Sequence, residues 1–399
     1  MKSYIQKLYH SSEKQSRRII GLMSGTSLDG LDIALCHISG HGLKTSVELE
    51  KFVTVPYETP FRHAVQRIFA KRDVDLQEVT LLNGWIAEQH AEMINKTLKT
   101  WQVSACDIDC IASHGQTVFH CPKEQHGLGE YGHGTLQIGD GDRLAVLTGI
   151  ITLSDFRQKH IAAGGEGAPL AVYGDYLMFS DPIENRLLLN MGGIANFTWL
   201  PAGNNASSVF STDVGPGNTI IDAFVAQHFS HLRYDKDGKL AAAGKVNEDL
   251  LHSLLSHEFF SYSMPKTTGP EVFNLDYLKQ ARITSQTLAI SDCDVIATLT
   301  AFSARAICNG IVEMAGLADN NVVYASGGGV HNPVLMEMIT TLLPNNIRVC
   351  NLSEIGISPD AKEAVLFAIL ANETIAGTPC FEGNRYDIPN TTMGKVSLP

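Results

Sequence analysis

The sequence predicts an α/β protein with two lobes of related topology, on three observations. The chain has 399 residues, which is more than one ordinary hydrophobic core accommodates. Strand-like and helix-like segments alternate along it, as they do in α/β proteins. A strand, a glycine-rich turn and a second strand occur near residue 19, and the same pattern returns near residue 186. We therefore expect an N-terminal tail over 1–18, a first lobe over 19–183 and a second lobe over 184–399.

The expected elements follow from the periodicity of apolar residues. Apolar runs bounded by glycine or polar residues indicate strands at 17–23, 31–38, 107–115, 186–193, 195–200 and 322–328. Apolar residues three and four positions apart indicate helices at 79–101, 218–229 and 298–316. The expected core face of the first helix carries Leu82, Ile86, His90 and Ile94.

Composition argues against several classes of partner. The formal net charge is -12, whereas a nucleic-acid footprint needs clustered Lys and Arg. No uncharged apolar run reaches about 18 residues, the length of a membrane-spanning helix, and the N-terminal segment lacks the apolar core of a signal peptide. The cysteines mostly lie in apolar runs, so we expect reduced thiols in a cytoplasmic protein. They are Cys36, Cys106, Cys110, Cys121, Cys293, Cys308, Cys350 and Cys380.

The first motif is GLMSGTSLDGLD, residues 21–32, between two expected strands. Gly25 and Gly30 allow backbone geometries that turn several N–H groups toward one side, where they can bind phosphate oxygens. Neighbouring serine and threonine hydroxyls add donors. The carboxylates of Asp29 and Asp32 would repel phosphate unless a cation intervenes, and Mg²⁺ is commonly held by carboxylates, water and substrate phosphates. A polar hairpin without a ligand is the alternative that this motif leaves open.

Two further glycine motifs follow expected strands. In FSTDVGPGNTIID, residues 210–222, Asp213 ends an apolar run beside a glycine turn that opens a helix, where an anion can bind. By itself Asp213 could equally be a turn or N-cap residue. In VVYASGGGVHNP, residues 322–333, three glycines would let a flat ligand approach the main chain, although a flexible turn gives the same pattern.

Signatures of other enzyme classes are absent or out of context. The chain has no GxxxxGK[ST] phosphate loop, and its one GxGxxG run, at 127–132, lies in a polar loop without a preceding strand. A zinc site would need a different ligand spacing, because the cysteines and histidines over 106–121 contain no CxxC pair. Buried cysteines are the better interpretation of that segment.

Taken in chain order, the glycine motifs resemble the two-lobed ATPases of the actin, hexokinase and Hsp70 superfamily, which hold nucleotide between ribonuclease H-like lobes. Within that superfamily, the chain resembles the anhydro-N-acetylmuramic acid kinases over residues 19–394. The blocks that carry the resemblance are GLMSGTSLDGLDIAL, IASHGQTVFH, LQIGDGDRLA, DFR, AAGGEGAPL, NMGGIANFT, DVGPGNTIIDA, TGPEVFN, TLTAFSA, GGGVHNP and DAKEAVLFA.

The resemblance implies an enzyme that phosphorylates O6 of 1,6-anhydro-N-acetylmuramic acid with ATP and opens the internal bridge by adding water at C1. The products would be N-acetylmuramic acid 6-phosphate and ADP, in peptidoglycan recycling. It implies ATP and Mg²⁺ as cofactors, a small amino sugar as substrate and neither nucleic acid nor membrane as partner, and it allows a homodimer. Two alternatives stay open: another amino-sugar kinase on the same scaffold, and a nucleotide-dependent binding protein.

The resemblance also assigns roles to residues. The catalytic base falls on Asp213, Glu363 matches a second acidic position in the sugar site, and Asp29 is the expected metal ligand. The substrate contacts are His114, Gln116, Arg157 and Glu363, with Arg157 facing the lactyl carboxylate. The ATP contacts are Gly25, Thr26, Ser27, Leu28, Asp29, Gly30, Leu31 and Asp32 in the first lobe, and Gly192, Gly193, Gly215, Gly217, Asn218, Gly327, Gly328, Gly329 and Asn332 in the second.

Two segments depart from the family pattern. Gln158, Lys159, His160 and Glu166 stand where we expect Arg, Arg, Asp and Gln. The loop over 122–135 is also longer than expected. No role is carried over onto its histidines.

Overall fold

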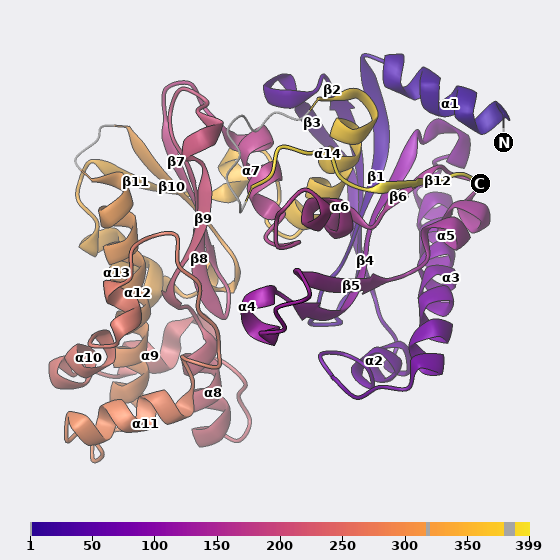
Figure 1. Ribbon diagram of the computed structural model, residues 1–399. Helices are drawn as coiled ribbons and strands as arrows, with labels where there is room; N and C mark the ends of the chain where they lie inside the picture. Colours follow the sequence, from indigo (N-terminus) through magenta and orange to yellow (C-terminus); the bar gives the residue numbers. More distant parts are fainter. Residues whose placement is uncertain (1, 317–319, 379–387) are drawn as a thin grey trace. The chain divides into compact units, whose positions relative to one another are not determined.

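The computed structural model describes residues 2–316, 320–378 and 388–399, whose helices and strands are drawn in Figure 1. The chain forms two compact units, unit 1 from Met1–Phe179 with Asp360–Pro399 and unit 2 from Ser180–Pro359. The first change of unit lies four residues before the expected division at 183/184. Residues 360–399 differ from the expectation of a second lobe over 184–399, because the helix α14 (Lys362–Ala376) packs on the sheet of unit 1.

Unit 1 is built on a mixed sheet. Its strands are β1 (Ser16–Ser24), β2 (Gly30–Ser39), β3 (Ser46–Pro56), β4 (Cys110–Cys121), β5 (Gly134–Ile138), β6 (Thr152–Ser154) and β12 (Lys395–Ser397). Their order is β12-β6-β4-β1-β2-β3, with β5 paired to β4. The first three strands are antiparallel neighbours, whereas β4 runs parallel to β1 and β6 runs parallel to β4.

Helices cover both faces of this sheet (Figure 1). The helices of unit 1 are α1 (Lys2–Glu13), α2 (Thr59–Gln66), α3 (Leu76–Trp101), α4 (Lys123–His126), α5 (Gly141–Thr148), α6 (Phe156–Ala162), α7 (Ala171–Phe179) and α14. Along β1, Ile20 and Leu22 share a core with Ile86 of α3, and Gly21, between them, lies against α14. All four residues that periodicity assigned to the core face of α3 are buried, which confirms that prediction.

Unit 2 repeats the strand order of unit 1. Its strands are β7 (Asn185–Met191), β8 (Ile194–Leu200), β9 (Phe210–Pro216), β10 (Asn321–Ser326) and β11 (Ile347–Asn351), in the order β11-β10-β7-β8-β9. The first three are antiparallel neighbours, and β10 runs parallel to β7 and to β11. Both sheets therefore have three meandering strands followed by two parallel ones, which is the ribonuclease H-like order. The predicted fold class is confirmed, and the repeated motif in the sequence marks a structural duplication.

The helices of unit 2 are α8 (Thr219–His228), α9 (Lys239–Ala243), α10 (Glu248–Leu255), α11 (Leu275–Thr284), α12 (Asp292–Ala315) and α13 (Pro333–Leu342). By length and composition α12 could cross a membrane, and it is the one such helix in the described part of the chain. In the structure 83% of its apolar window is buried inside the protein. It packs against α9, α10 and α13 as a core helix.

The expected tail over 1–18 contains a helix, α1, and the beginning of β1. The carboxylate of Asp109 accepts a 2.8 Å hydrogen bond from Ser11 Oγ and pairs with Lys14 Nζ at 2.6 Å. Arg17 is 3% exposed and donates to backbone carbonyls at the end of α1. These anchors are polar contacts between segments far apart in sequence, so no apolar periodicity announces them.

The described cysteines carry free thiols, as expected of a protein with reduced cysteines. Cys36, Cys110 and Cys308 are buried. Cys380 lies outside the described residues.

Candidate active site

The first glycine motif forms the turn between β1 and β2. Leu28 carries the unusual backbone geometry of this turn, with φ of 59°, and its N–H donates to Gly25 O at 3.3 Å. Neither Gly25 nor Gly30 has a positive φ. The positive φ of this turn is thus carried by a leucine whose side chain is held in the core at 3% exposure, and by neither glycine.

The exposed side chains of this turn are those of Thr26, Ser27 and Asp29. Leu31 is 1% exposed and packs in the core. Gly30 lies so close to β3 that a Cβ atom would come 2.4 Å from a carbonyl oxygen of that strand. The turn can thus offer phosphate its backbone N–H groups and two hydroxyls, while Leu28 and Leu31 offer no side chain.

The carboxylates of Asp29 and Asp360 act on a third carboxylate of unit 1, that of Asp32. Burial raises the pKa of Asp32, the 2.5 Å hydrogen bond from Thr54 Oγ1 opposes this, and the carboxylates of Asp360 and Asp29 raise the pKa further. Sequence reasoning gave Asp360 no role, although it begins the DAKEAVLFA block. Its position could be found only from the packing of residues 360–399 on unit 1.

These carboxylates suit Mg²⁺ in the chemistry of their donors. Among the described residues, no group of three or more His, Cys, Asp or Glu side chains could hold a metal ion. Mg²⁺ needs no such cage, because it is usually bound through one or two carboxylates, water and substrate phosphates. Asp29 and Asp32 would supply those one or two carboxylates.

His114 and Arg157, two predicted substrate contacts, lie side by side. The Nε of Arg157 donates to His114 Nε2 at 3.0 Å, and His114 Nδ1 lies 2.9 Å from Gly115 O. An arginine only donates, so Nε2 is the unprotonated nitrogen and Nδ1 carries the hydrogen. Burial, and then the charge of Arg157, lower the pKa of His114 to about 3, so the imidazole is neutral. His114 therefore orients Arg157 rather than presenting a free nitrogen.

Glu363 lies in the first turn of α14, near this pair. Burial raises its pKa, the ammonium of Lys362 opposes that rise, and the nearby charges of Asp32 and Arg157 act in opposite directions. Lys362 itself pairs with the buried Asp175 at 2.7 Å. The predicted sugar-site residues Glu363 and Arg157 are thus brought together within unit 1, although they lie far apart in the sequence.

Gln116 is 0% exposed, and its amide is occupied by the protein. Its Oε1 accepts a 2.5 Å hydrogen bond from Ser24 Oγ, and its Nε2 donates to the carbonyls of Gly25 at 3.4 Å and Thr117 at 3.2 Å. The structure therefore puts this predicted substrate contact against the first glycine turn, where its amide binds Ser24, Gly25 and Thr117.

Asp213 lies in β9 at a point where the register against β8 shifts, a β-bulge of the kind that often adjoins active sites. Gly215 follows with φ of 145°. The N–H of Thr268 donates to Asp213 Oδ2 at 2.9 Å, the one hydrogen bond to this carboxylate in the described part of the chain. Burial raises the pKa of Asp213 to about 6, against the effect of that N–H and with a smaller contribution from Glu271. A carboxylate with this pKa is ionised at neutral pH and can accept a proton.

Two glycine turns of unit 2 are joined through their main chains. The N–H groups of Gly217 and Thr219 donate to Gly193 O at 2.8 and 3.1 Å, and that of Asn218 donates to Gly192 O at 2.9 Å. A Cβ atom on Gly217 would lie 2.3 Å from Gly192 O. The N–H of Thr219, the first residue of α8, and those of Gly217 and Asn218 before it are therefore satisfied within the protein. These hydrogen bonds do not involve the N–H groups of Ile220 and Ile221, so the expectation that this helix start faces an anion stays a prediction.

The glycine triplet reaches the same place. Asn218 Nδ2 donates to Met191 O at 3.3 Å, and a Cβ atom on Gly327 would lie 2.8 Å from that same oxygen. A Cβ atom on Gly329 would lie 2.6 Å from Met191 Cβ. Three glycine motifs from distant parts of the sequence thus meet around the end of β7.

Gly328 and Asn332 differ in what they can offer a ligand. Gly328 is the most open of the triplet, since a Cβ atom there would meet nothing nearer than 3.9 Å. Asn332 caps α13, because its Oδ1 accepts from the N–H groups of Val334 and Leu335 at 3.1 and 3.2 Å. Its predicted adenosine contact stays a prediction, and its carbonyl group is already used by the helix.

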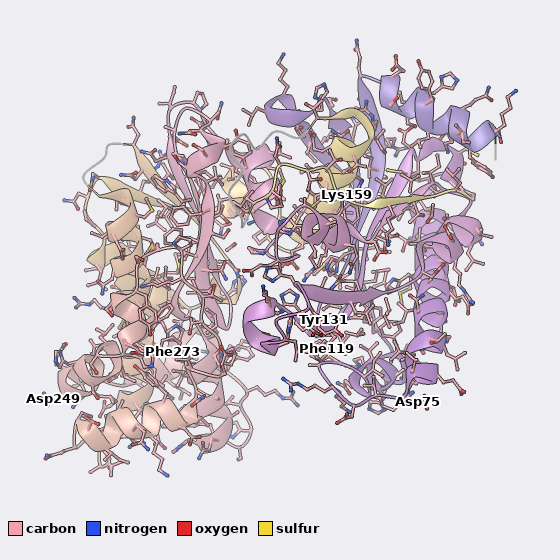
Figure 2. All side chains as sticks on the ribbon, viewed as in Figure 1. Asp75, Phe119, Tyr131, Lys159, Asp249 and Phe273 are labelled. Atoms are coloured by element: carbon pink, nitrogen blue, oxygen red, sulfur yellow. The ribbon has the colours of Figure 1, made fainter. Side chains whose placement is uncertain are left out.

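The departures from the family pattern have local structural roles or none. Gln158 Nε2 donates to Thr135 O at 2.7 Å, and the buried His160 accepts from Gly167 N at 2.9 Å, which shapes the glycine loop that follows. Lys159, labelled in Figure 2, and Glu166 are exposed. In the longer loop, Tyr131 is 64% exposed (Figure 2).

A family model and two relatives in sequence indicate one family. A model of the anhydro-N-acetylmuramic acid kinases matches residues 17–388. A protein of that name from Pseudoalteromonas atlantica is 60% identical over all of both chains, and another from Caldanaerobacter subterraneus subsp. tengcongensis is 40% identical over 99% of this chain and all of its own. Among solved structures, an activator of the 2-hydroxyisocaproyl-CoA dehydratase from Clostridium difficile with bound ADPNP is 13% identical, covering 90% of this chain and 95% of its own at a TM-score of 0.36.

Proposed function

Because the chain belongs to the anhydro-N-acetylmuramic acid kinase family, we propose that it phosphorylates O6 of 1,6-anhydro-N-acetylmuramic acid with ATP while water opens the 1,6 bridge. The products are N-acetylmuramic acid 6-phosphate and ADP, which fits a role in peptidoglycan recycling. The observation that carries the hydrolytic step is the carboxylate of Asp213, held by one N–H beside a β-bulge with its pKa raised to about 6.

The bonds change in one coupled sequence. Asp213 accepts a proton from water as the water oxygen bonds to C1 of the sugar. The C1–O6 bond breaks and its electron pair passes to O6, which bonds to the γ-phosphorus of ATP. The bond from that phosphorus to the β,γ-bridging oxygen breaks, and ADP leaves. O6 carries no proton in the bridged sugar, so the base has to act on water.

Arg157 is the residue proposed to bind the lactyl carboxylate. Its guanidinium is oriented by His114 through the 3.0 Å hydrogen bond. Burial lowers the pKa of Arg157, but the ordinary pKa of arginine, 12.5, lies so far above neutrality that the group keeps its charge. A fixed, charged guanidinium suits a planar carboxylate. Glu363, near Arg157, is proposed to contact the sugar or the attacking water.

Asp29 and Asp32 are proposed to hold Mg²⁺ together with the triphosphate, and the bound ion would neutralise phosphate charge during transfer. Removing Mg²⁺ with EDTA should abolish turnover, and adding Mg²⁺ back should restore it. The assay is ADP release with the anhydro sugar present. Full activity in EDTA would contradict the assignment of Asp29 and Asp32.

Running the reaction in ¹⁸O-labelled water tests the proposed function. We expect one labelled oxygen on C1 of the sugar phosphate and none in the phosphoryl group, because water attacks carbon and O6 attacks phosphorus. Mass spectrometry of the intact product and of its released phosphate locates the label. N-acetylglucosamine, whose 6-hydroxyl is free, serves as the comparison substrate.

Label in phosphate alone would indicate simple ATP hydrolysis. Efficient phosphorylation of N-acetylglucosamine with no reaction of the anhydro sugar would indicate a different amino-sugar kinase. Either result contradicts the proposal.

A further inference from the structure

A network of hydrogen-bonded, buried polar side chains runs through unit 1 to the first glycine turn, Gly25–Asp29. It consists of His90 in α3, Tyr57 after β3, Ser24 at the end of β1 and Gln116 in β4. Their exposed fractions are 1%, 4%, 2% and 0%. The proposed reaction uses none of these groups, and a core position on α3 would ordinarily hold an apolar residue.

Each hydrogen bond of the network is short. His90 Nε2 lies 2.9 Å from Tyr57 Oη, Tyr57 Oη lies 2.7 Å from Ser24 Oγ, and Ser24 Oγ lies 2.5 Å from Gln116 Oε1. Buried polar groups left without a hydrogen bond cost stability, so such a network is stable when every side chain in it has a hydrogen-bond partner.

The direction of each hydrogen bond follows from the last member. Gln116 Nε2 faces two carbonyls, so Oε1 faces Ser24 and can only accept. Ser24 therefore donates to Gln116 and accepts from Tyr57, and Tyr57 in turn accepts from the N–H of His90. Each hydroxyl has one hydrogen, so no other arrangement satisfies all four side chains.

The hydrogen-bond network contacts both ends of the turn Gly25–Asp29. At the first end, the Gln116 amide donates to Gly25 O. At the second end, the backbone N–H of Tyr57 donates to Asp29 O at 3.1 Å. Tyr57 is thus connected to the first end through its hydroxyl and to the second end through its main chain.

The hydrogen-bond network of these four side chains is uncharged and does not move protons to a reacting group. Burial lowers the pKa of His90 to about 4 and raises the pKa of Tyr57, so both are neutral around pH 7. Its last contacts are backbone carbonyls, which accept hydrogen bonds but do not relay protons at neutral pH. Its effect is on the position of the turn.

We propose that His90, Tyr57, Ser24 and Gln116 are positioning residues that hold the turn Gly25–Asp29 in the conformation that binds the triphosphate. The proposal rests on the proposed assignment of that turn to ATP. It gives Gln116 a role different from the sugar contact that the sequence predicts. Removing one hydrogen bond of this network should weaken nucleotide binding and leave sugar binding unchanged.

The central experiment compares Tyr57→Phe with Tyr173→Phe. Both changes remove one buried tyrosine hydroxyl from unit 1, since Tyr173 Oη donates to Pro389 O at 2.8 Å, which is not part of the turn Gly25–Asp29. We expect Tyr57→Phe to weaken binding of ADPNP with Mg²⁺ by about 5- to 10-fold, the effect of one buried hydrogen bond. Tyr173→Phe should bind it as the wild type does. Calorimetric titration measures the affinity, and thermal unfolding verifies that both variants are folded.

Two further substitutions separate positioning from mere stability. Gln116→Met has a similar volume but no amide, so KM for ATP should rise while KM for the anhydro sugar stays unchanged. His90→Gln keeps an N–H donor for Tyr57 and should restore most of the ADPNP affinity that His90→Leu loses.

The outcomes are distinct. Equal ADPNP affinities for Tyr57→Phe and Tyr173→Phe overturn the inference, and so does a Gln116→Met variant whose KM rises for the sugar alone. Wild-type protein that binds ADPNP but does not turn over the sugar refutes the proposed function and leaves this test intact. Wild-type protein that fails to bind ADPNP refutes both.

Discussion

Replacing Asp213 with asparagine should lower kcat by a factor of about 10²–10⁴, the usual contribution of a general base. Asparagine has the same size, and its Oδ1 can accept the hydrogen bond that Thr268 N–H gives to the carboxylate. It cannot take a proton from water. Steady-state kinetics with ATP and the anhydro sugar measure the loss, and a titration with ADPNP should give the wild-type affinity.

Asp222→Asn is the matched control. Asp222 lies in α8 of the same unit, and burial together with the charge of Asp235 raises its pKa to about 6 as well. We expect this variant to keep the wild-type kcat. Near-normal turnover by Asp213→Asn, or an equal loss in both variants, would remove Asp213 as the base.

The raised pKa of Asp213 also determines in which direction kcat/KM and the stability of the protein change with pH. In the free enzyme kcat/KM should fall as the pH drops below about 6, because the protonated carboxyl cannot act as a base. The ordinary pKa of an aspartate in an unfolded chain is 3.8, so the folded state holds this proton more tightly than the unfolded state does. Ionisation thus costs stability, by an amount that is absent below pH 3.8, grows up to about pH 6 and is complete above it. Asp213→Asn should therefore be at least as thermostable as the wild type at pH 7.

The strands and central helices were predictable because their signals are local. The run predicted at 17–23 is β1 (Ser16–Ser24), and the helix predicted at 79–101 is α3 (Leu76–Trp101). The predicted start of α12 at 298 is late, since the helix begins at Asp292 after the N-cap Ser291. The return of residues 360–399 to unit 1 depends on packing against β1, about which a local pattern carries no information.

The site was predictable only in part, for the same reason. Family motifs named Asp213, Arg157 and Glu363, and the structure gives each an environment in which a carboxylate or guanidinium can act. They could not reveal that Gln116 bonds to Ser24, 92 positions away, or that Leu28 rather than a glycine carries the positive φ of the turn. Hydrogen-bond partners and backbone angles are set by tertiary contacts that residue type alone leaves open.

Replacing Gly21 with alanine should destabilise the protein by about 3 kcal/mol, near the upper end of the usual cost of overpacking. A Cβ atom at this position would lie 1.8 Å from Ala364 O, in the first turn of α14. A main-chain carbonyl cannot swing aside as a flexible side chain can, so the helix itself has to move. Thermal unfolding should show a Tm lowered by about 6–12 °C for a unit of this size.

Gly129→Ala is the control, because a Cβ atom there would meet nothing within 4 Å and the backbone has no positive φ. It should unfold as the wild type does. Gly21→Ala should also lower kcat when assayed well below its Tm, since Ala364 adjoins Glu363 and a displaced helix moves that carboxylate away from Arg157. Lowered stability with unchanged kcat would mean that Glu363 takes no part in the reaction. Wild-type stability would mean that β1 and α14 are not in contact at Gly21.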